Sequence, residues 1–136
     1  MPWFVLLRRV LKRRVRRRRV RKVTAKSRAE FKVLSPAART LVHERLAYFN
    51  KYYGYKYGKV FIRNTRTRWG TCSSRGNLGF NYRIAKLPPE LQDYIVVHEL
   101  CHLAELNHSA AFWALVAQTL PDWKQLRKQL GKYKMV

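Results

Sequence analysis

The segment from residue 91 to residue 106 is apolar on nearly every side, yet His98, Glu99 and His102 lie within it. On a helix with 3.6 residues per turn, its valines, leucines and isoleucine surround the axis, so the helix must be buried on most sides. Burying His98, Glu99 and His102 without a partner would cost several kcal/mol. A metal ion would be such a partner, so the segment predicts a domain that buries this helix around a polar site.

The two histidines have the spacing of an HExxH motif. On a helix, His98 and His102 lie about 40° apart on adjacent turns, and both imidazoles can reach one ion. Glu99 lies beside them, where a carboxylate can take a proton from metal-bound water. The motif therefore predicts a catalytic zinc site. The alternative is a coincidence in which the histidines are ordinary polar residues.

A third ligand is expected after this helix. Three of the four histidines fall between residues 98 and 108, and His108 follows a possible chain reversal at Asn107. Three histidines and one water would complete an open catalytic site. Glu105 is the rival ligand, but a straight helix places it about 10 Å along the axis from His98. We favour His108 as the third ligand. Glu105 is expected to contact a metal-binding side chain or to lie on the surface, and Cys101 is expected to pack in the core.

Charge divides the 136-residue chain into two parts. Lys and Arg number 30 against 7 Asp and Glu, for a formal net charge of +23, of which residues 1–32 carry 14 basic residues and one acid. We predict a flexible basic arm over residues 1–34 and one domain over residues 35–136. The arm would bind nucleic acid through phosphates, an anionic membrane, or no dedicated partner. The candidate phosphate-binding arginines are Arg13, Arg14, Arg16, Arg17, Arg18 and Arg19.

Several protein classes are disfavoured. No apolar run approaches the roughly 18 residues that cross a bilayer. The five apolar residues at positions 3–7 precede the arginines, which is the reverse of a signal peptide. Cys72 and Cys101 form no CxxC pattern, so neither a disulfide framework nor a cysteine zinc site is indicated. These features favour a cytoplasmic protein, and nothing in the sequence indicates an oligomeric state.

The remaining patterns predict an α+β fold. Ser35 and Pro36 are expected to begin a helix that ends at Gly54. Three short strand candidates follow at residues 60–62, 68–72 and 78–82, and they favour a small three-stranded antiparallel sheet. The histidine-bearing helix is expected to run from Pro88 to a left-handed stop at Asn107. Two C-terminal helices are predicted at residues 109–120 and 121–131.

Ordered motifs along the chain resemble the YgjP-like zinc metallopeptidases, which are relatives of the SprT-like proteins. They are RNTRTRWGTCS at 63–73, GNL at 76–78, NYR at 81–83, PPEL at 88–91, DY at 93–94, HELCH at 98–102, NHS at 107–109 and FW at 112–113. The resemblance covers residues 36–133 and implies a compact zincin-like α+β domain. It further implies zinc on His98, His102 and His108, with Glu99 catalytic. Longer family members carry a β-rich segment before this core, where this chain has the basic arm.

The expected activity is peptide-bond hydrolysis by zinc-bound water that Glu99 activates. Candidates for stabilising the transition state are Arg68, Tyr82 and Arg83. The strand at residues 78–82 would either hold an extended peptide or form an internal part of the sheet. Trp69 and Trp113 are expected in the core or the cleft wall.

Two other functions stay open at this stage. One is a zinc-dependent hydrolase of a nucleotide or another phosphate-containing substrate, which the basic surface favours but the absence of a phosphate-binding Gly-rich loop disfavours. The other is a nucleic-acid-binding protein with structural zinc. A three-histidine site with a free water position argues against the latter, because structural zinc sites are closed by four protein ligands.

Overall fold

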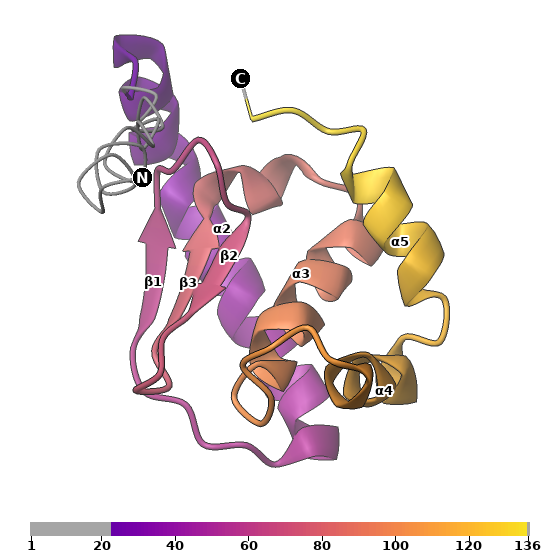
Figure 1. The fold of residues 1–136 in the computed structure, drawn as a ribbon. Coiled ribbons are helices and arrows are strands. Elements are labelled where there is room, and N and C mark those ends of the chain that lie inside the picture. Colours follow the sequence, from indigo (N-terminus) through magenta and orange to yellow (C-terminus); the bar gives the residue numbers. More distant parts are fainter. Residues whose placement is uncertain (1–22, 136) are drawn as a thin grey trace, which may run out of the picture.

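The computed structural model describes residues 23–135, which form an α+β fold of helices around a small sheet (Figure 1). The α+β class predicted from the sequence is confirmed. No helix in residues 23–135 is both long and apolar enough to cross a membrane. The arginines predicted to bind nucleic acid, residues 13–19, lie outside the described residues. The elements are α2 (Ala25–Tyr53), β1 (Val60–Arg63), β2 (Gly70–Cys72), β3 (Leu78–Asn81), η1 (Tyr82–Lys86), α3 (Pro89–Cys101), α4 (Ala110–Thr119) and α5 (Trp123–Leu130).

Helix α2 begins ten residues before the predicted start at Ser35, so that expectation was wrong. Thr24 caps the helix by accepting a hydrogen bond from the Ser27 amide at 3.1 Å. Pro36 lies inside the helix, on its exposed face, where the carbonyl that loses its partner can bond to water. The helix therefore crosses residue 34, at which the basic arm was predicted to end, and Phe31 packs edge-on against Tyr82.

The sheet is mixed, and the antiparallel arrangement predicted from the sequence was wrong. Its strand order is β1-β3-β2, with β3 parallel to β1 and antiparallel to β2. All four residues of β3 are buried, and a strand buried on both faces takes the centre of a sheet. Gly76, at φ 81°, forms the turn that joins β2 to β3 as a hairpin. Between β1 and β2, the loop over residues 64–69 carries the chain across the end of β3 to the opposite edge of the sheet.

Helix α3 is the central helix of the fold and packs against α2, β2, α4 and α5. Figure 1 shows it between the sheet on one side and α4 and α5 on the other. It ends at Cys101, five residues before the predicted end, and no described residue other than glycine has a positive φ. The left-handed stop at Asn107 was therefore wrong. The amides of Leu103 and Ala104 instead bond to the carbonyls three residues back and tighten the turn.

The two C-terminal helices agree with the sequence prediction. Ser109 caps α4 by accepting a hydrogen bond from the Phe112 amide at 3.3 Å. Helix α5 follows Asp122 and ends before Gly131. Both cysteines are free, and Cys101 is fully buried in the core as expected.

Candidate metal centre

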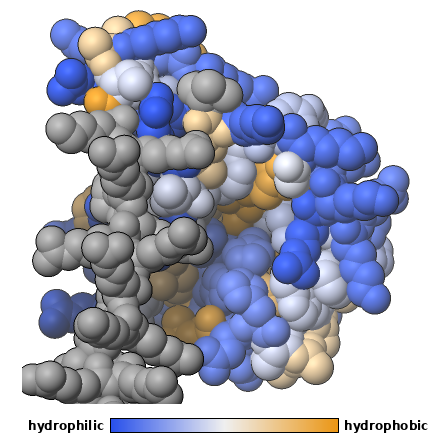
Figure 2. Space-filling model, turned by 45° about the horizontal axis from the view of Figure 1, so that its top comes forward, coloured by the Kyte–Doolittle hydropathy of each residue, from blue (hydrophilic) through white to orange (hydrophobic). Residues whose placement is uncertain are grey.

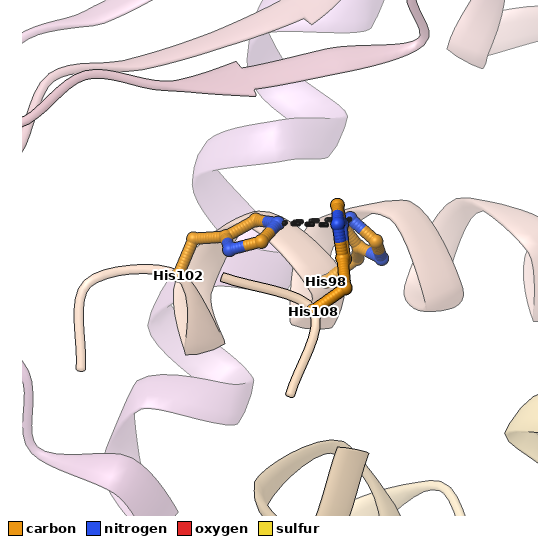
Figure 3. A group of neighbouring side chains, drawn as sticks. All are labelled: His98, His102 and His108. Atoms are coloured by element: carbon orange, nitrogen blue, oxygen red, sulfur yellow. Dashed lines mark hydrogen bonds between the residues drawn. The ribbon is translucent and has the colours of Figure 1, made fainter. Parts of the chain in front are cut away.

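Three imidazoles converge at the C-terminal end of α3 (Figure 3). His98 belongs to the last turn of α3, His102 follows the helix, and His108 precedes the cap of α4. Each pair of their Nε2 atoms is 3.1 Å apart, so the three atoms form an equilateral triangle. The turn after α3 fixes the orientation of the His102 ring, because its Nδ1–H donates to the Glu105 carbonyl at 2.9 Å. That bond leaves the Nε2 lone pair of His102 free for another partner.

The triangle fits a tetrahedral metal ion. Three nitrogens at about 2.0–2.1 Å from a tetrahedral zinc lie about 3.3 Å from one another. The observed separations of 3.1 Å are close to that value. Nitrogen ligands from three neutral imidazoles are also the donor set of open catalytic zinc sites, in which a fourth position stays available. The arrangement can therefore hold one divalent transition metal.

Burial favours the neutral form of two of the imidazoles, His98 and His102. Burial, together with the smaller electrostatic effects of His102 and His108, lowers the pKa of His98 to about 3. Burial also lowers the pKa of His102, against the raising effect of its bond to the Glu105 carbonyl. Because metal ligation needs unprotonated nitrogens, protons compete weakly with a metal for His98 at neutral pH.

Aromatic rings of α4 fix the positions of the imidazoles. Phe112 is fully buried and stacks on His102, with ring centroids 4.3 Å apart and planes 18° apart. Its ring also contacts His98 and His108 edge-on. Trp113 packs near His98 and His108 and stacks on Trp123 at 4.1 Å. The cap at Ser109 thus brings a rigid aromatic layer against the three ligand candidates.

Glu99 is buried beside this triangle and lies against the backbone of β2. Its exposed fraction is 5%, and an ideal Cβ at Gly70 would lie 2.7 Å from both Cγ and Oε1 of Glu99. Any larger residue at position 70 would displace the glutamate side chain from this position. Burial raises the pKa of Glu99 to about 8, and the charge of Arg68 opposes that rise. A carboxylate in this position is poised to accept a proton near neutral pH.

A cavity of about 370 Å³ opens next to His98 and Glu99. Its floor is α3, and its walls come from the start of β2 on one side and from α5 with the following residues on the other. Figure 2, in which the top of Figure 1 is tilted toward the viewer, shows a largely hydrophilic surface around a hollow that exposes hydrophobic residues. The lining residues are Arg68, Trp69, Gly70, Tyr94, Ile95, His98, Glu99, Arg127, Leu130, Gly131 and Tyr133.

The structure brings only part of the predicted site together. Arg68, a candidate for stabilising the transition state, lines the cavity. Trp69, which was expected in the core or the cleft wall, lines it as well. Tyr82 and Arg83 do not line it. The Tyr82 hydroxyl donates to Glu30 at 2.9 Å, and the Arg83 guanidinium donates to the Thr65 carbonyl at 3.1 Å, so both residues link α2, η1 and the loop before β2.

Glu105 contacts the site through its backbone, and its side chain is outside the group that could hold a metal. Of the two alternatives for the strand at residues 78–82, the internal one applies, because β3 is paired on both edges and has no free backbone groups for a substrate. Sequence reasoning missed seven of the lining residues: Gly70, Tyr94, Ile95, Arg127, Leu130, Gly131 and Tyr133. Tyr94 and Ile95 carried a signal, since they are four and three residues before His98 on the same helix face.

Comparison with known proteins agrees with this geometry. The family model "YgjP-like, metallopeptidase domain" matches residues 7–133. The chain belongs to this family. It is therefore a hydrolase of the metallopeptidase type, and the resemblance seen in its motifs is confirmed. The family match also begins at residue 7, so it includes most of the basic arm that the motifs alone left outside the family core.

Solved structures of two metallopeptidase zymogens share the fold of this YgjP-like chain. The metallopeptidase zymogen abylysin of Pyrococcus abyssi has a TM-score of 0.61 and 27% identity, and the match covers 70% of this chain and 99% of abylysin. The metallopeptidase zymogen jannalysin of Methanocaldococcus jannaschii has a TM-score of 0.55 and 19% identity, and the match covers 70% of this chain and 94% of jannalysin. No curated protein matches the chain in sequence.

Proposed function

We propose that the chain is a zinc-dependent peptidase in which His98, His102 and His108 hold the metal and Glu99 is the general base. The observation that carries the proposal is the convergence of three Nε2 atoms next to a buried carboxylate at the floor of a cavity. Zinc is the metal we propose, because an all-imidazole donor set with an open position suits it.

The chain's own residues divide the chemistry between them. When bound, the ion would polarise a peptide carbonyl and lower the pKa of a water. Glu99 takes a proton from the attacking water and delivers it to the leaving amine. Gly70 keeps this carboxylate in place, because the backbone of β2 approaches it without a side chain between them. The Glu105 carbonyl orients His102 by accepting the Nδ1 proton.

An extended peptide would bind along β2. This strand is at one edge of the sheet, with its other edge paired by none of the described strands. Its first residue, Gly70, lines the cavity and contacts Glu99. A peptide that adds to this edge by main-chain hydrogen bonds would therefore cross the cavity above α3. The edge strand β2 replaces the buried strand at residues 78–82 as the candidate.

The cavity beside the triangle also weighs against a purely structural zinc. Structural sites are closed by four protein ligands, whereas the group found within residues 23–135 contains three. Likeness to the zymogens of abylysin and jannalysin supports peptide hydrolysis rather than nucleotide hydrolysis. Non-specific binding of nucleic acid by the arginines at residues 13–19 stays a separate proposal about the arm.

The substitution Glu99→Gln tests the assignment. The variant keeps the shape of the side chain but cannot accept a proton, so it should retain one equivalent of zinc and lose peptide hydrolysis by about 1,000-fold or more. Zinc content by mass spectrometry and turnover of a mixed peptide pool measure the two effects. Near-normal turnover would overturn the role of Glu99. Hydrolysis of nucleoside triphosphates, but of no peptide, by the zinc-loaded protein would overturn the peptidase.

A further inference from the structure

We propose that the catalytic cleft selects peptides that carry a carboxylate near the scissile bond, and that Arg68 and Arg127 bind it. This inference rests on the proposed peptidase function and concerns its substrate class. The carboxylate has two possible sources, an acidic side chain or a free C-terminus, and the experiment below separates them. The two arginines lie on opposite walls of the cavity, one before β2 and one on α5.

The backbone at Arg68 is held rigidly at the first wall. The buried Asn81 amide donates to the Arg68 carbonyl at 3.2 Å, and the Asn81 backbone amide bonds to the Trp69 carbonyl at 2.8 Å. The Thr65 hydroxyl also donates to the Arg68 carbonyl, at 3.0 Å. The Arg68 side chain remains exposed and lines the cavity. It projects from a fixed point beside Glu99.

Arg127 is positioned at the opposite wall by stacking. Its guanidinium lies 5.2 Å from the ring centre of Trp113. Trp113 in turn stacks on Trp123 at 4.1 Å and lies 5.8 Å from the ring of His98. A guanidinium over an aromatic face keeps its edge N–H groups free for a carboxylate. Arg127 thus presents its N–H donors to the cavity while it stacks on Trp113, which itself packs against the proposed metal ligand His98.

Neither arginine has a carboxylate partner within the described part of the chain. The ion pairs found there are Arg45 with Asp93 and Lys86 with Glu30, and both are away from the cavity. Glu99 is the one acid among the lining residues, and its role as base commits it to the reacting water. The cleft thus has two cations on its walls and no lining acid besides Glu99. This charge favours an anionic substrate and disfavours a substrate with lysine or arginine at the same subsites.

The other walls favour a peptide as the carrier of that charge. Trp69, Tyr94 and Tyr133 line the cavity with aromatic surface that can pack on side chains. Arginine binds a carboxylate through two parallel N–H groups, which fixes the orientation of the bound chain. With one arginine on each side of α3, a carboxylate on either side of the scissile bond would find a partner.

Binding to the inactive, zinc-loaded Glu99→Gln protein tests the inference without requiring turnover. The probes are fluorescent decapeptides of one alanine and phenylalanine sequence with Glu, Gln or Lys at the central positions, each with a free or an amidated C-terminus. We expect the Glu peptide to bind at least about tenfold more tightly than the Gln peptide, and the Lys peptide to bind most weakly. An effect confined to free C-termini would assign the terminal carboxylate as the ligand.

Charge reversal provides the decisive variant. Arg127→Glu, in the same background, should weaken binding of the Glu peptide and strengthen binding of the Lys peptide, so that the order of preference inverts or levels. Lys128→Glu is the matched control, because Lys128 is exposed on the same helix and does not line the cavity. Arg68→Gln should reduce the preference in the same direction. Each variant's melting temperature checks that it is folded.

The outcomes separate this inference from the proposed function. If the active enzyme cleaves Glu, Gln and Lys peptides equally and Arg127→Glu changes none of them, the carboxylate preference is overturned while the peptidase stands. If the active enzyme cleaves no peptide, yet Glu99→Gln binds the Glu peptide selectively, the peptidase fails and the carboxylate site stands. Equal effects of Arg127→Glu and Lys128→Glu would mean that overall charge, not the cleft, determines binding.

Discussion

Gly70 leaves the space that the Glu99 side chain occupies beside the backbone of β2. A Cβ at Gly70 would lie 2.7 Å from Oε1 of Glu99, closer than real Cβ contacts allow. The approach joins the edge of the sheet to the histidine-bearing helix at the proposed reacting group. The position of the general base therefore depends on a strand residue almost thirty positions earlier in the chain.

The substitution Gly70→Ala should impair the reaction without removing the metal. The new methyl group must push the Glu99 carboxylate away, and a displacement of about 1 Å at a reacting group can cost about 100-fold in rate. Zinc content should stay at that of the wild type, because the three atoms nearest the new methyl group belong to Glu99 and not to a histidine. Turnover and metal content, measured on the same preparation, check this. Loss of zinc together with activity would contradict it.

The ligand set predicts opposite results for His108 and Glu105. His108→Ala removes a corner of the nitrogen triangle, so zinc affinity should fall by more than the roughly 10–100-fold that loss of an outer partner causes. Glu105→Ala keeps the backbone carbonyl that accepts the His102 proton, so affinity should change little. Competition with a chelating dye measures both variants. A large loss in Glu105→Ala would return the glutamate side chain to the ligand set.

Phe112 should influence stability and metal binding together. It is fully buried and touches all three imidazoles, so Phe112→Ala should cost about 3–5 kcal/mol and weaken zinc binding as the rings gain freedom. Val116→Ala is the control, since this residue is also fully buried on α4 but outside the ring cluster. It should lower the free energy of unfolding while zinc affinity stays unchanged. Denaturant titration and dye competition separate the two effects.

Local signals were sufficient for the elements that hold the proposed ligands. The HExxH spacing follows from helix geometry, Ser109 is an N-cap of the preferred type, and Pro89 falls at the first position of α3. His108 was predicted from its position six residues after His102 and from the grouping of three histidines, and the structure brings its Nε2 to the other two. These features depend on residues close in sequence, which is why the sequence contained them.

Features that depend on the tertiary structure could not be predicted in the same way. Pro36 indicates a helix start locally, but the exposed face of α2 tolerates it and the packing of Phe31 extends the helix. Strand alternation says nothing of which strand is central, and the burial of β3 decides that. The close approach at Gly70 and the stacking of Arg127 on Trp113 join distant segments, so no local pattern shows them.

The extended start of α2 leads to a pH-dependent prediction at Glu30. This residue lies in the part of α2 that sequence reasoning assigned to the arm, and its carboxylate pairs with Lys86 and accepts from the Tyr82 hydroxyl. The hydrogen bond from Lys86, followed by that from Tyr82, lowers the pKa of Glu30 below its ordinary value, against the effect of burial. The charged carboxylate therefore stabilises the fold at neutral pH.

Glu30→Gln removes the charge and keeps an oxygen for Tyr82. A lowered pKa in the folded state means that the stabilisation is complete above the unfolded pKa of about 4.3 and disappears as the pH falls through the lower folded value. The variant should thus be less stable than the wild type at pH 7, by up to about 1 kcal/mol for a partly exposed pair, and equal to it in strong acid. Urea titrations from pH 7 to pH 2 measure the difference. Glu44→Gln is the control, because Glu44 is exposed on the same helix and is outside any ion pair in the described residues. Its stability should not differ from that of the wild type in this pH-dependent way. If Glu30→Gln is still less stable than the wild type at pH 2, the effect comes from packing rather than charge.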